Sequence, residues 1–355
     1  MRLSSVEVIP YALPFKRPYV TARGALERRE MVLLRVRDAD GVVGLGEAVP
    51  LSLRGGATLT EVVRELEEWA EAQEDEGLSA PARCAVAVAR MDLLGRRAAD
   101  KGGGDEAVPC NATLAAGEPE AVAADAEAWA ADGFGTFKLK LGAESAKSLV
   151  EQGKSRTRES RDLEMVQAVR EALGAEVRIR IDANQAWDLE TAKERLGELE
   201  PYGIELAEQP VGTLGEMAEL AQATSIPLAA DESVASLGEA EEAGALGACA
   251  YTGVKLSKVG GPEEALAIAD VLPAYITSAL DGPVGIAAGA QTALRLAETG
   301  HPERLHLAHG LATQRLFAST IASVECELRN GMLHLPPGPG LGVEIDEDAL
   351  QTHRL

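Results

Sequence analysis

The first hundred residues show short runs of alternating apolar and polar positions, followed by two stretches with helical periodicity. The runs EVIPYALPF (7–15) and MVLLRVRDADGVVGLGEAVP (31–50) are typical of β-strands, and the DADG within the second predicts a hairpin turn. The stretches TEVVRELEEWAEAQ (60–73) and PARCAVAVARMDLLGRRAAD (81–100) predict helices. Strands followed by helices favour a small α+β domain.

After residue 104 the pattern changes to short apolar strands that alternate with amphipathic helices. Eight strands in strict βα alternation predict a parallel (β/α) barrel of the TIM type. A doubly wound sheet is the alternative, but no strand is followed by a GxGxxG or GxxxxGK motif. The eight predicted strands are VPCNATL, TFKLKLG, VRIRIDAN, IELAEQP, IPLAADES, YTGVKLS, AYITSAL and LHLAHGL.

These patterns divide the chain into three parts. We expect an α+β capping domain over residues 1–104, the barrel over 105–320, and a C-terminal segment over 321–355 that returns to the capping domain. An Asn-Gly pair at 330–331 predicts a hairpin within that segment. The long polar stretch 143–160 is predicted to be a protruding loop.

Composition narrows the classes of partner. The net charge is -23 at pH 7, which argues against nucleic acid and against an anionic membrane surface. Four cysteines without CxxC spacing indicate reduced thiols rather than zinc ligands or disulfides. The N-terminal residues lack an apolar signal sequence and no run of 18 apolar residues occurs. We therefore expect a cytoplasmic protein and leave a homo-oligomer open.

The chain has few lysines, and four of them lie in apolar segments. Lys138 and Lys140 are two apart on one predicted strand, and therefore share a face. Outward they would lie against the helical layer, whereas inward they would meet carboxylates at the barrel mouth. Lys255 approaches from the opposite side of the barrel, and Lys258 is expected in a solvated loop. A lysine held near a divalent cation has a lowered pKa and can act as a base near neutral pH. The alternative is that these lysines only form structural salt bridges.

Carboxylates follow three consecutive predicted strands. Asp182, Glu208 and Asp231 stand at carboxyl ends of strands, which converge on one site in a βα barrel. Any one of them could be a helix N-cap, but three in succession favour a shared site. A cluster of carboxylates repels itself unless a cation neutralises it. Oxygen ligands without Cys or His favour Mg²⁺, with Mn²⁺ as a substitute.

Together, the motifs KLKLG, RIDANQAWD, AEQPV, AADES and GVKLSKVGG resemble the enolase superfamily, in particular its muconate-lactonizing-enzyme subgroup. The resemblance covers nearly the whole chain and implies a barrel enzyme with a capping domain that acts on a small-molecule carboxylate. It implies that an α-proton is removed and that a metal-stabilised enediolate forms. The resemblance implies that the Mg²⁺ ligands are Asp182, Glu208 and Asp231. It implies that the acid/base residues are Lys140 and Lys255, and that Lys138 supports Lys140. It also implies that two residues lie just behind those that contact metal or substrate: Asn184 and Glu232.

Members of this subgroup catalyse different reactions. Dipeptide epimerases carry Asp-x-Asp after the eighth strand, where this chain has LHLAHGLAT without an acid. No histidine occurs before residue 301, which excludes the His–Asp pair of mandelate racemases. The stretches SALDGPVGIAAGA and VPCNATL are similar to o-succinylbenzoate synthases of menaquinone biosynthesis. We therefore expect a hydro-lyase, with N-acylamino acid racemase, dipeptide epimerase and muconate cycloisomerase as alternatives.

The substrate pocket is harder to predict. Candidate lining residues are Ser278, Ala279, Gly285 and Asn111, and the arginines Arg17, Arg23 and Arg54 are candidates for a substrate carboxylate. A non-catalytic binding protein on the same scaffold is a further alternative, but it would be free to lose a lysine or a metal ligand. Every such position is intact here.

Overall fold

The computed structural model describes residues 3–21, 24–52, 55–98, 101–102, 106–142, 158–298 and 307–355. The predicted loop after Gly142 falls largely on residues 143–157, outside the described residues. The same is true of two candidate arginines, Arg23 and Arg54.

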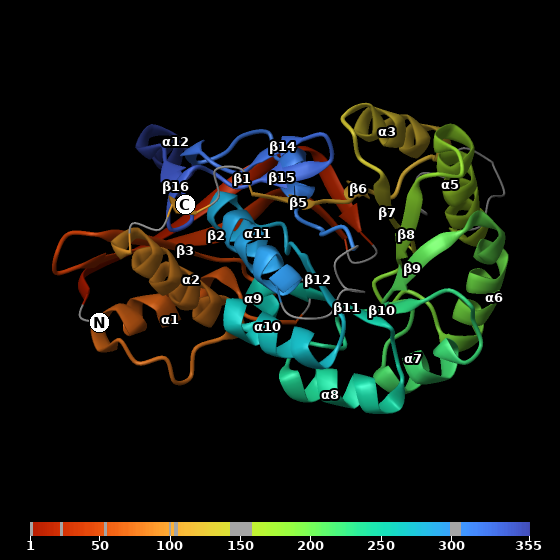
Figure 1. Cartoon of the computed structure of the whole chain (residues 1–355), viewed down its shortest axis with the longest axis horizontal. Coiled ribbons are helices and arrows are strands. Elements are labelled where there is room, and N and C mark those ends of the chain that lie inside the picture. Colours follow the sequence, from red (N-terminus) through yellow and green to blue (C-terminus); the bar gives the residue numbers. More distant parts are fainter. Residues whose placement is uncertain are drawn as a thin grey trace.

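The N-terminal unit is an antiparallel sheet covered by two helices (Figure 1). The predicted turn is confirmed, because the Asp38 carboxylate accepts the backbone N–H groups of Asp40 and Val42, both at 2.9 Å. Gly44 lets a helix approach its strand closely, since a Cβ there would lie 2.3 Å from the Ala89 carbonyl oxygen. The elements are β1 (Leu3–Thr21), β2 (Gly24–Asp38), β3 (Val43–Ala48), α1 (Leu59–Ala72) and α2 (Ala80–Arg97).

Both helices form where the periodicity predicts them. Thr58 and Glu61 form a capping box at the start of α1, which satisfies two backbone N–H groups that have no partner inside the helix. Val62, Leu66 and Trp69 repeat at helical spacing and are buried in the core between α1, α2 and the sheet. This unit therefore has an apolar core of its own.

The barrel consists of parallel strands enclosed by an arc of helices (Figure 1). Its sheet has the order β12-β11-β10-β9-β8-β7-β6, so neighbours in sequence are neighbours in space. The strands are β6 (Ala112–Leu114), β7 (Thr136–Lys140), β8 (Arg178–Asp182), β9 (Ile204–Glu208), β10 (Leu228–Ala230), β11 (Tyr251–Lys255) and β12 (Ala274–Thr277). The helices and 3-10 turns are α3 (Pro119–Ala131), α5 (Arg158–Leu173), α6 (Leu189–Leu199), η2 (Glu200–Tyr202), α7 (Leu214–Ala221), α8 (Leu237–Leu246), α9 (Leu256–Val259), α10 (Pro262–Val271), α11 (Pro283–Glu298) and η4 (Ala312–Leu316).

The first and eighth predicted strands differ from expectation. VPCNATL is split, because β5 (Ala107–Pro109) leaves the barrel and pairs antiparallel with β15 (Met332–His334). In the described part of the predicted eighth strand, only single parallel bridges form, from His309 to Cys110 and from Gly310 to Thr277. These bridges join the two edges of the seven-stranded sheet and close the barrel.

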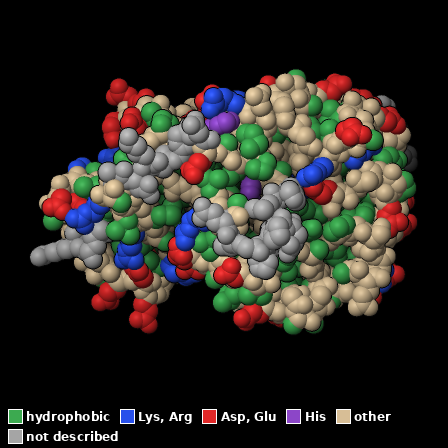
Figure 2. Space-filling view, viewed as in Figure 1, with side chains coloured by type: hydrophobic (Ala, Val, Ile, Leu, Met, Phe, Trp, Pro, Cys, Tyr) green, Lys and Arg blue, Asp and Glu red, His purple; other side chains and the backbone are tan. Residues whose placement is uncertain are grey.

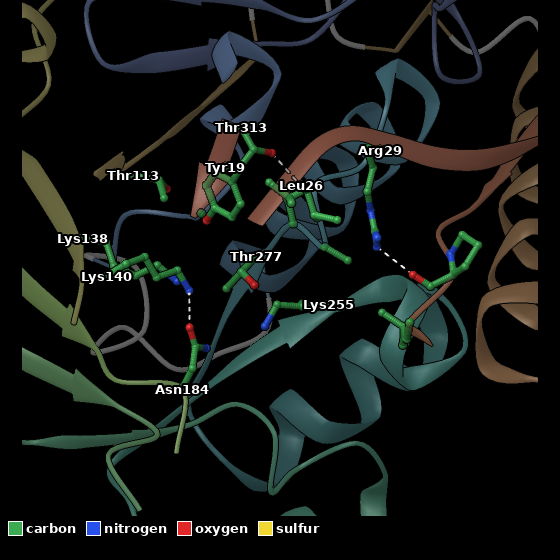
Figure 3. A pocket seen from close by; sticks show the side chains of 16 residues that line it. Tyr19, Leu26, Arg29, Thr113, Lys138, Lys140, Asn184, Lys255, Thr277 and Thr313 are labelled. Atoms are coloured by element: carbon green, nitrogen blue, oxygen red, sulfur yellow. Dashed lines mark hydrogen bonds between the residues drawn. The ribbon is translucent and has the colours of Figure 1, made fainter. Parts of the chain in front are cut away.

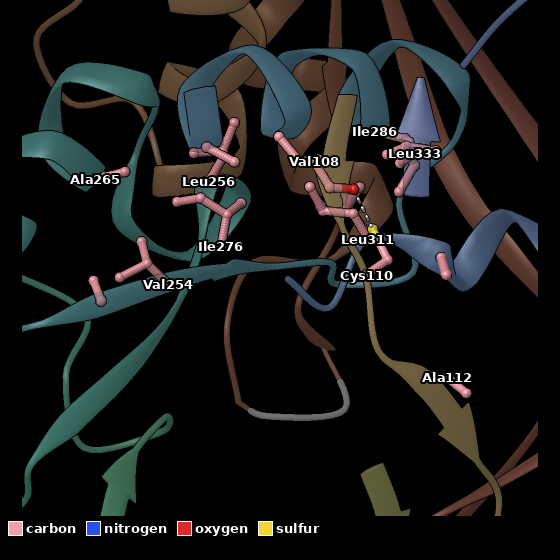
Figure 4. Packing of buried hydrophobic residues seen from close by; sticks show 14 of the residues in the cluster. Val108, Cys110, Ala112, Val254, Leu256, Ala265, Ile276, Ile286, Leu311 and Leu333 are labelled. Atoms are coloured by element: carbon pink, nitrogen blue, oxygen red, sulfur yellow. Dashed lines mark hydrogen bonds between the residues drawn. The ribbon is translucent and has the colours of Figure 1, made fainter. Parts of the chain in front are cut away.

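Buried apolar side chains surround the closing point of the barrel. The side chains of Cys110, Ile276 and Leu311 belong to the main buried cluster, and Figure 4 shows Leu311 beside Cys110. His309 Nδ1 accepts the backbone N–H of Ile276 at 3.0 Å. Burial, helped by the charge of Arg180, lowers the pKa of His309 to about 3. This imidazole is therefore a neutral structural acceptor near neutral pH.

The C-terminal segment lies against the N-terminal unit. A bridge joins Tyr11 to Arg354, and the Leu355 N–H donates to the Pro10 carbonyl at 3.0 Å. The hairpin at Asn330 and Gly331 is confirmed, with φ of 52° and 71°. The strand β16 (Gly338–Pro339) of the C-terminal segment pairs with β4 (Lys101–Gly102). The other elements of the C-terminal segment are β13 (Ala322–Val324), β14 (Glu327–Arg329), β17 (Glu344–Ile345) and α12 (Glu347–His353).

The surface reflects the acidic composition. On the face shown in Figure 2, Asp and Glu side chains are spread around the edge of the molecule. None of the helices in the described part of the chain is long and apolar enough to cross a membrane.

Candidate active site

Two lysines enter the barrel from β7. Lys138 and Lys140 have the same orientation along the strand, and both side chains are buried. Parallel pairing sets Lys138 beside Arg180 and Lys140 beside Asp182 on β8. The inward orientation predicted from their spacing is therefore the one that the structure has.

The three predicted carboxylates come together with these lysines. Lys138 Nζ donates to both oxygens of Glu208, at 3.0 and 3.1 Å, and to Asp182 Oδ2 at 3.2 Å. Lys140 forms an ion pair with Asp182, and Lys255 forms one with Asp231. All three carboxylates are almost inaccessible to solvent. We call these six residues, with Lys258, the mouth cluster.

The expectation for Lys258 was wrong. Its side chain is only 9% exposed, and Nζ donates to Asp231 Oδ1 at 3.0 Å as well as to the Asp231 backbone oxygen. The reason is local, because the short helix α9 begins directly after Lys255 and brings a residue three positions later back to the same side. The four lysines of the mouth cluster thus face its three carboxylates.

Mutual attraction favours the charged forms of Lys138, Lys140 and Asp182. Burial by itself would lower the pKa of Lys138, but the charges of Glu208 and Asp182 outweigh it and raise that pKa above its ordinary value. The pKa of Lys140 is raised in the same way, chiefly by Asp182. Burial raises the pKa of Asp182, but the two lysines reverse the effect and lower it. The lowering of a lysine pKa that we expect beside a divalent cation stays a prediction, because these shifts arise from the carboxylates alone.

The donor set suits a hard cation, although the described side chains are not gathered around one. Among the residues that the structure describes, no three His, Cys, Asp or Glu side chains surround a common point. Asp182, Glu208 and Asp231 instead bond to lysines. Their ligand chemistry, oxygen only and buried, fits Mg²⁺. In this arrangement the lysines supply the positive charge that the carboxylates need.

Asn184 and Glu232 link the mouth cluster to the loops after β8 and β10. Asn184 Oδ1 accepts from Lys140 Nζ at 3.2 Å, and its Nδ2 donates to Glu232 Oε1 at 3.1 Å. Asn184 has φ of 47°, a left-handed conformation that asparagine tolerates better than most residues. Asn184 thus contacts Lys140 directly and Glu232 contacts Asn184, while the supporting roles that the resemblance implies for them stay predictions.

Two buried residues of the site were missed by the sequence analysis. Tyr275 donates its hydroxyl to Glu208 Oε2 at 2.6 Å. The Arg180 guanidinium lies over the Tyr275 ring, 5.1 Å from its centroid, and donates to the Ala308 carbonyl at 2.7 Å. Arg180 is detectable in RIRID, because it lies two residues before Asp182 and so shares its face. Tyr275 carries no comparable sequence pattern.

A cavity lies above the mouth cluster, between the capping unit and the barrel. Figure 3 shows Lys138 and Lys140 on one side of it, with Lys255 and Thr277 nearer its centre. Its capping wall includes Tyr19, Leu26, Arg29, Pro50 and Leu51.

Two of the four predicted pocket residues line this cavity and two do not. Ser278 and Ala279 belong to its lining. Gly285 lies in the first turn of α11, where a Cβ would lie 2.7 Å from Glu47 Oε1, so it packs on the capping unit instead. Asn111 is buried at the barrel closure and donates to the Ala112 carbonyl. Arg17 is exposed and forms an ion pair with Asp125 at 2.8 Å.

The loop after β12 is fixed by buried acids. Asp281 accepts from the Ser278 hydroxyl at 2.7 Å and the Ala279 N–H at 2.6 Å. Leu280, which also lines the cavity, has φ of 66°. Glu47 of β3 accepts the Tyr11 hydroxyl at 2.8 Å and the Gly282 N–H at 2.7 Å. We call Glu47, Tyr11 and Asp281 the seam cluster, because it joins the capping unit to this loop.

Family comparisons agree with this architecture. Residues 4–100 match the N-terminal domain of the mandelate racemase / muconate lactonizing enzyme family, and residues 121–349 match the family described as enolase C-terminal domain-like. The chain belongs to the enolase superfamily, in its muconate-lactonizing-enzyme subgroup.

Relatives in that subgroup differ in reaction. An o-succinylbenzoate synthase of Thermobifida fusca is 36% identical over 61% of this chain, and the match spans 62% of that enzyme. A chloromuconate cycloisomerase of Pseudomonas putida is 28% identical over 99% of this chain and 98% of that enzyme. The solved structure of a dipeptide epimerase from Enterococcus faecalis, complexed with Mg and L-Leu-L-Tyr, is 26% identical with a TM-score of 0.84, covering 97% of this chain and 100% of that one.

Proposed function

We propose that this protein is a Mg²⁺-dependent enzyme that removes the proton α to a carboxylate and dehydrates 2-succinyl-6-hydroxy-2,4-cyclohexadiene-1-carboxylate to o-succinylbenzoate. The observation that carries the proposal is that Lys140 and Lys255 line one cavity from β7 and β11. These strands lie four places apart in the barrel order. A substrate between them presents one face to each lysine.

Lys140 takes the α-proton in its neutral form and then returns a proton to the departing hydroxyl, which leaves as water. One lysine serves both steps because the proton and the hydroxyl lie on the same face in a syn elimination. Lys255 stays protonated, and its charge offsets the negative charge that develops on the substrate carboxylate. Lys138 holds Glu208 and Asp182 in place through three hydrogen bonds.

Asp182, Glu208 and Asp231 would hold the metal, with Mn²⁺ as a substitute. When bound, the divalent cation would supply positive charge for the enediolate and would favour the neutral form of a nearby lysine. Asn184 and Glu232 orient Lys140 from behind through their hydrogen-bonded chain. Strand register places Asp182 beside Glu208, and metal binding would require these carboxylates to give up part of their contacts with lysines.

Two features favour dehydration over dipeptide epimerisation. The described part of the segment that closes the barrel, residues 307–313, contains no acid. The described lining of the cavity also contains no Asp or Glu. A dipeptide ammonium would thus lack a buried carboxylate partner, and an unpaired buried charge costs several kcal/mol.

Racemisation of N-acylamino acids is the second candidate, because it needs the same two opposed lysines and no ammonium site. Cycloisomerisation of muconate also fits the scaffold, and the relatives support these reactions as well as the synthase. For each of these three reactions we propose that the substrate is a small-molecule carboxylate and that the enzyme acts in the cytoplasm.

A side-by-side measurement of kcat/KM tests the assignment. We expect efficient turnover of the cyclohexadiene, weaker racemisation of N-succinylamino acids, and negligible epimerisation of L-Ala-Glu-type dipeptides. A preference for dipeptides of about tenfold or more, equivalent to about 1.4 kcal/mol, would overturn the assignment. EDTA should abolish turnover and Mg²⁺ or Mn²⁺ should restore it, whereas full activity in metal-free enzyme would contradict the metal requirement.

A further inference from the structure

Three threonines are among the described residues that line the cavity, and the hydroxyl groups of two of them have a partner within the protein. Thr313 Oγ1 donates to the Ser278 hydroxyl at 2.8 Å, and Thr113 Oγ1 accepts from Asn111 Nδ2 at 3.4 Å. Thr277 is 3% exposed, and its Oγ1 has no donor or acceptor within hydrogen-bonding distance among the described residues. A buried hydroxyl without a partner costs folding free energy, so a hydroxyl of this kind in a cavity wall is a candidate ligand contact.

The backbone of Thr277 is held on both sides. Thr277 is the last residue of β12, where parallel pairing sets it beside Lys255 of β11. On its other side it forms the bridge to Gly310 that helps to close the barrel. The next residue adds to this contact, because the Ser278 N–H donates to the Gly310 carbonyl at 3.0 Å. The Cβ atom of Thr277 therefore has a fixed place in the cavity wall.

The methyl group of Thr277 is fixed as well. A Cβ at Gly253 would lie 3.2 Å from Thr277 Cγ2, and a Cβ at Gly310 would lie 3.5 Å from the same atom. The two glycines thus leave the space that this methyl group occupies. Because threonine is branched at Cβ and stiff about χ1, a fixed methyl group also fixes the hydroxyl. The Thr277 hydroxyl is therefore oriented before any ligand arrives.

The position of this hydroxyl relates it to one lysine of the mouth cluster. Side chains at paired positions of neighbouring parallel strands lie on the same face of the sheet, and Thr277 and Lys255 both line the cavity. Figure 3 shows the two side chains close together, with Lys138 and Lys140 to one side. A ligand oxygen that approaches Lys255 in the cavity therefore also approaches the Thr277 hydroxyl.

We infer that the Thr277 hydroxyl donates a hydrogen bond to the substrate carboxylate attached to the carbon that loses its proton. This inference rests on the proposed function, in which the charge of Lys255 offsets the negative charge that develops on that carboxylate. Thr277 adds a neutral donor on the same side, and its hydrogen bond strengthens as the negative charge grows. Because the hydroxyl is already oriented, forming this bond requires little rearrangement of the protein.

A substrate contact of this kind has opposite effects on folding and on binding. Removing the hydroxyl should stabilise the ligand-free protein, because it eliminates a buried polar group that the described residues leave without a partner. The same change should weaken ligand binding. A hydroxyl with a purely structural role would instead stabilise the fold, and its removal would lower the melting temperature.

Two measurements on Thr277→Val test the inference: thermal unfolding without ligand, and titration calorimetry with o-succinylbenzoate in buffer with Mg²⁺. The melting temperature should rise by about 1–3 °C. The affinity for o-succinylbenzoate should fall roughly 10-fold, whereas Thr277→Ser keeps the hydroxyl and should bind within about threefold of the wild type. With the cyclohexadiene as substrate, Thr277→Val should lower kcat/KM by about 100-fold, because the hydrogen bond is strongest in the transition state.

The matched control is Thr292→Val on α11, which removes a buried hydroxyl that donates to the Ala288 carbonyl at 2.8 Å. This control should lower the melting temperature and leave the affinity for o-succinylbenzoate unchanged. A Thr277→Val protein that fails to fold, is less stable than the wild type, or binds o-succinylbenzoate as tightly as the wild type would overturn the inference. So would a wild-type protein that does not bind o-succinylbenzoate.

The outcomes separate this inference from the proposed function. A protein that binds o-succinylbenzoate through Thr277 but does not dehydrate the cyclohexadiene supports the contact and rejects the reaction. A protein that dehydrates the substrate equally well with Thr277→Val supports the reaction and rejects the contact.

Discussion

The mouth cluster and the seam cluster both bury carboxylates, but they surround them with different partners. At the mouth, Asp182 and Glu208 accept from Lys138, and Asp231 pairs with Lys255 and Lys258. At the seam, Glu47 and Asp281 accept mainly from neutral hydroxyl and backbone N–H groups.

The pKa of Asp182 at the mouth shifts in the opposite direction from the pKa values of Glu47 and Asp281 at the seam. At the mouth, Lys140 and Lys138 reverse the effect of burial and lower the pKa of Asp182. At the seam, burial raises the pKa of Glu47 to about 8, and the neighbouring Asp281 adds to the effect. Burial also raises the pKa of Asp281. The charge of the partners, and not burial alone, decides whether a buried acid stays ionised.

This difference matches the positions of the clusters. The mouth cluster holds opposed charges at the bottom of the cavity, where charge must develop during proton transfer. The seam cluster fixes the loop of Ser278, Ala279 and Leu280, which lines the same cavity. We therefore propose that the mouth cluster supplies the chemistry, whereas the seam cluster fixes the shape of the cavity.

The largest effect is expected at the mouth. Lys140→Ala should lower kcat by about a thousandfold, because it removes the proposed general base. Circular dichroism should show a retained fold. Lys193→Ala is the control and should leave kcat unchanged, because this partly exposed lysine of α6 pairs with Glu190 and with Glu219 of α7 and is not among the described residues that line the cavity. An active Lys140→Ala enzyme would make the mouth cluster a structural ion-pair network only.

An intermediate effect is expected for Lys258→Met. It leaves Asp231 with one cationic partner fewer, and breaking a buried ion pair costs roughly 3 kcal/mol of unfolding free energy. Urea unfolding of this variant, beside Lys193→Met, measures the loss. If Lys258 behaved as a solvated charge, the change would stay within about 0.5 kcal/mol.

The smallest effect concerns pH at the seam. Glu47 is protonated in the folded protein up to about pH 8, whereas in the unfolded chain it ionises near pH 4.3. Protons are therefore lost on unfolding, and stability falls as pH rises between these values. Glu47→Gln mimics the protonated acid. It should therefore remove about 2 kcal/mol of the decline in unfolding free energy that the wild-type protein shows between pH 6 and pH 8.

Chemical denaturation at several pH values measures this slope, with Glu67→Gln at an exposed position of α1 as control.

At the mouth, stability depends on pH in the opposite direction. Because the pKa of Asp182 is lowered, its contribution is present above the unfolded pKa of roughly 4 and is lost as pH falls below it. A Glu47→Gln variant with the wild-type slope would show that the seam acid is ionised, and would remove the contrast between the clusters.

The sequence predicted most of the barrel and the core of its site. Periodicity identified the strands β7 to β12 and the helices between them, because each strand is short, apolar and bounded by turns. It failed at the barrel closure, where the first strand is divided and the eighth is reduced to bridges. Those residues are apolar like a strand, and their pairing depends on segments distant in sequence.

Within the site, the same limit applies. Lys138, Lys140 and the three carboxylates follow from their places at strand ends. Lys258, Tyr275 and Arg29 do not, because their positions arise from a helix that begins at once after a strand, a cross-barrel contact, and a wall supplied by another domain. Gly285 was misplaced because a small residue in a loop motif indicates close packing without saying against what.

The sequence by itself determined the alternation of strands and helices, the face shared by the two lysines, and the order of charged residues around the barrel. These depend on local periodicity, which strand and helix geometry fix. The tertiary structure alone decided which charges meet and which pKa values rise or fall. It also decided that an arginine of the capping unit faces the lysines across a cavity. Those outcomes depend on distances between residues far apart in the chain, and on the exclusion of water that only the packed fold provides.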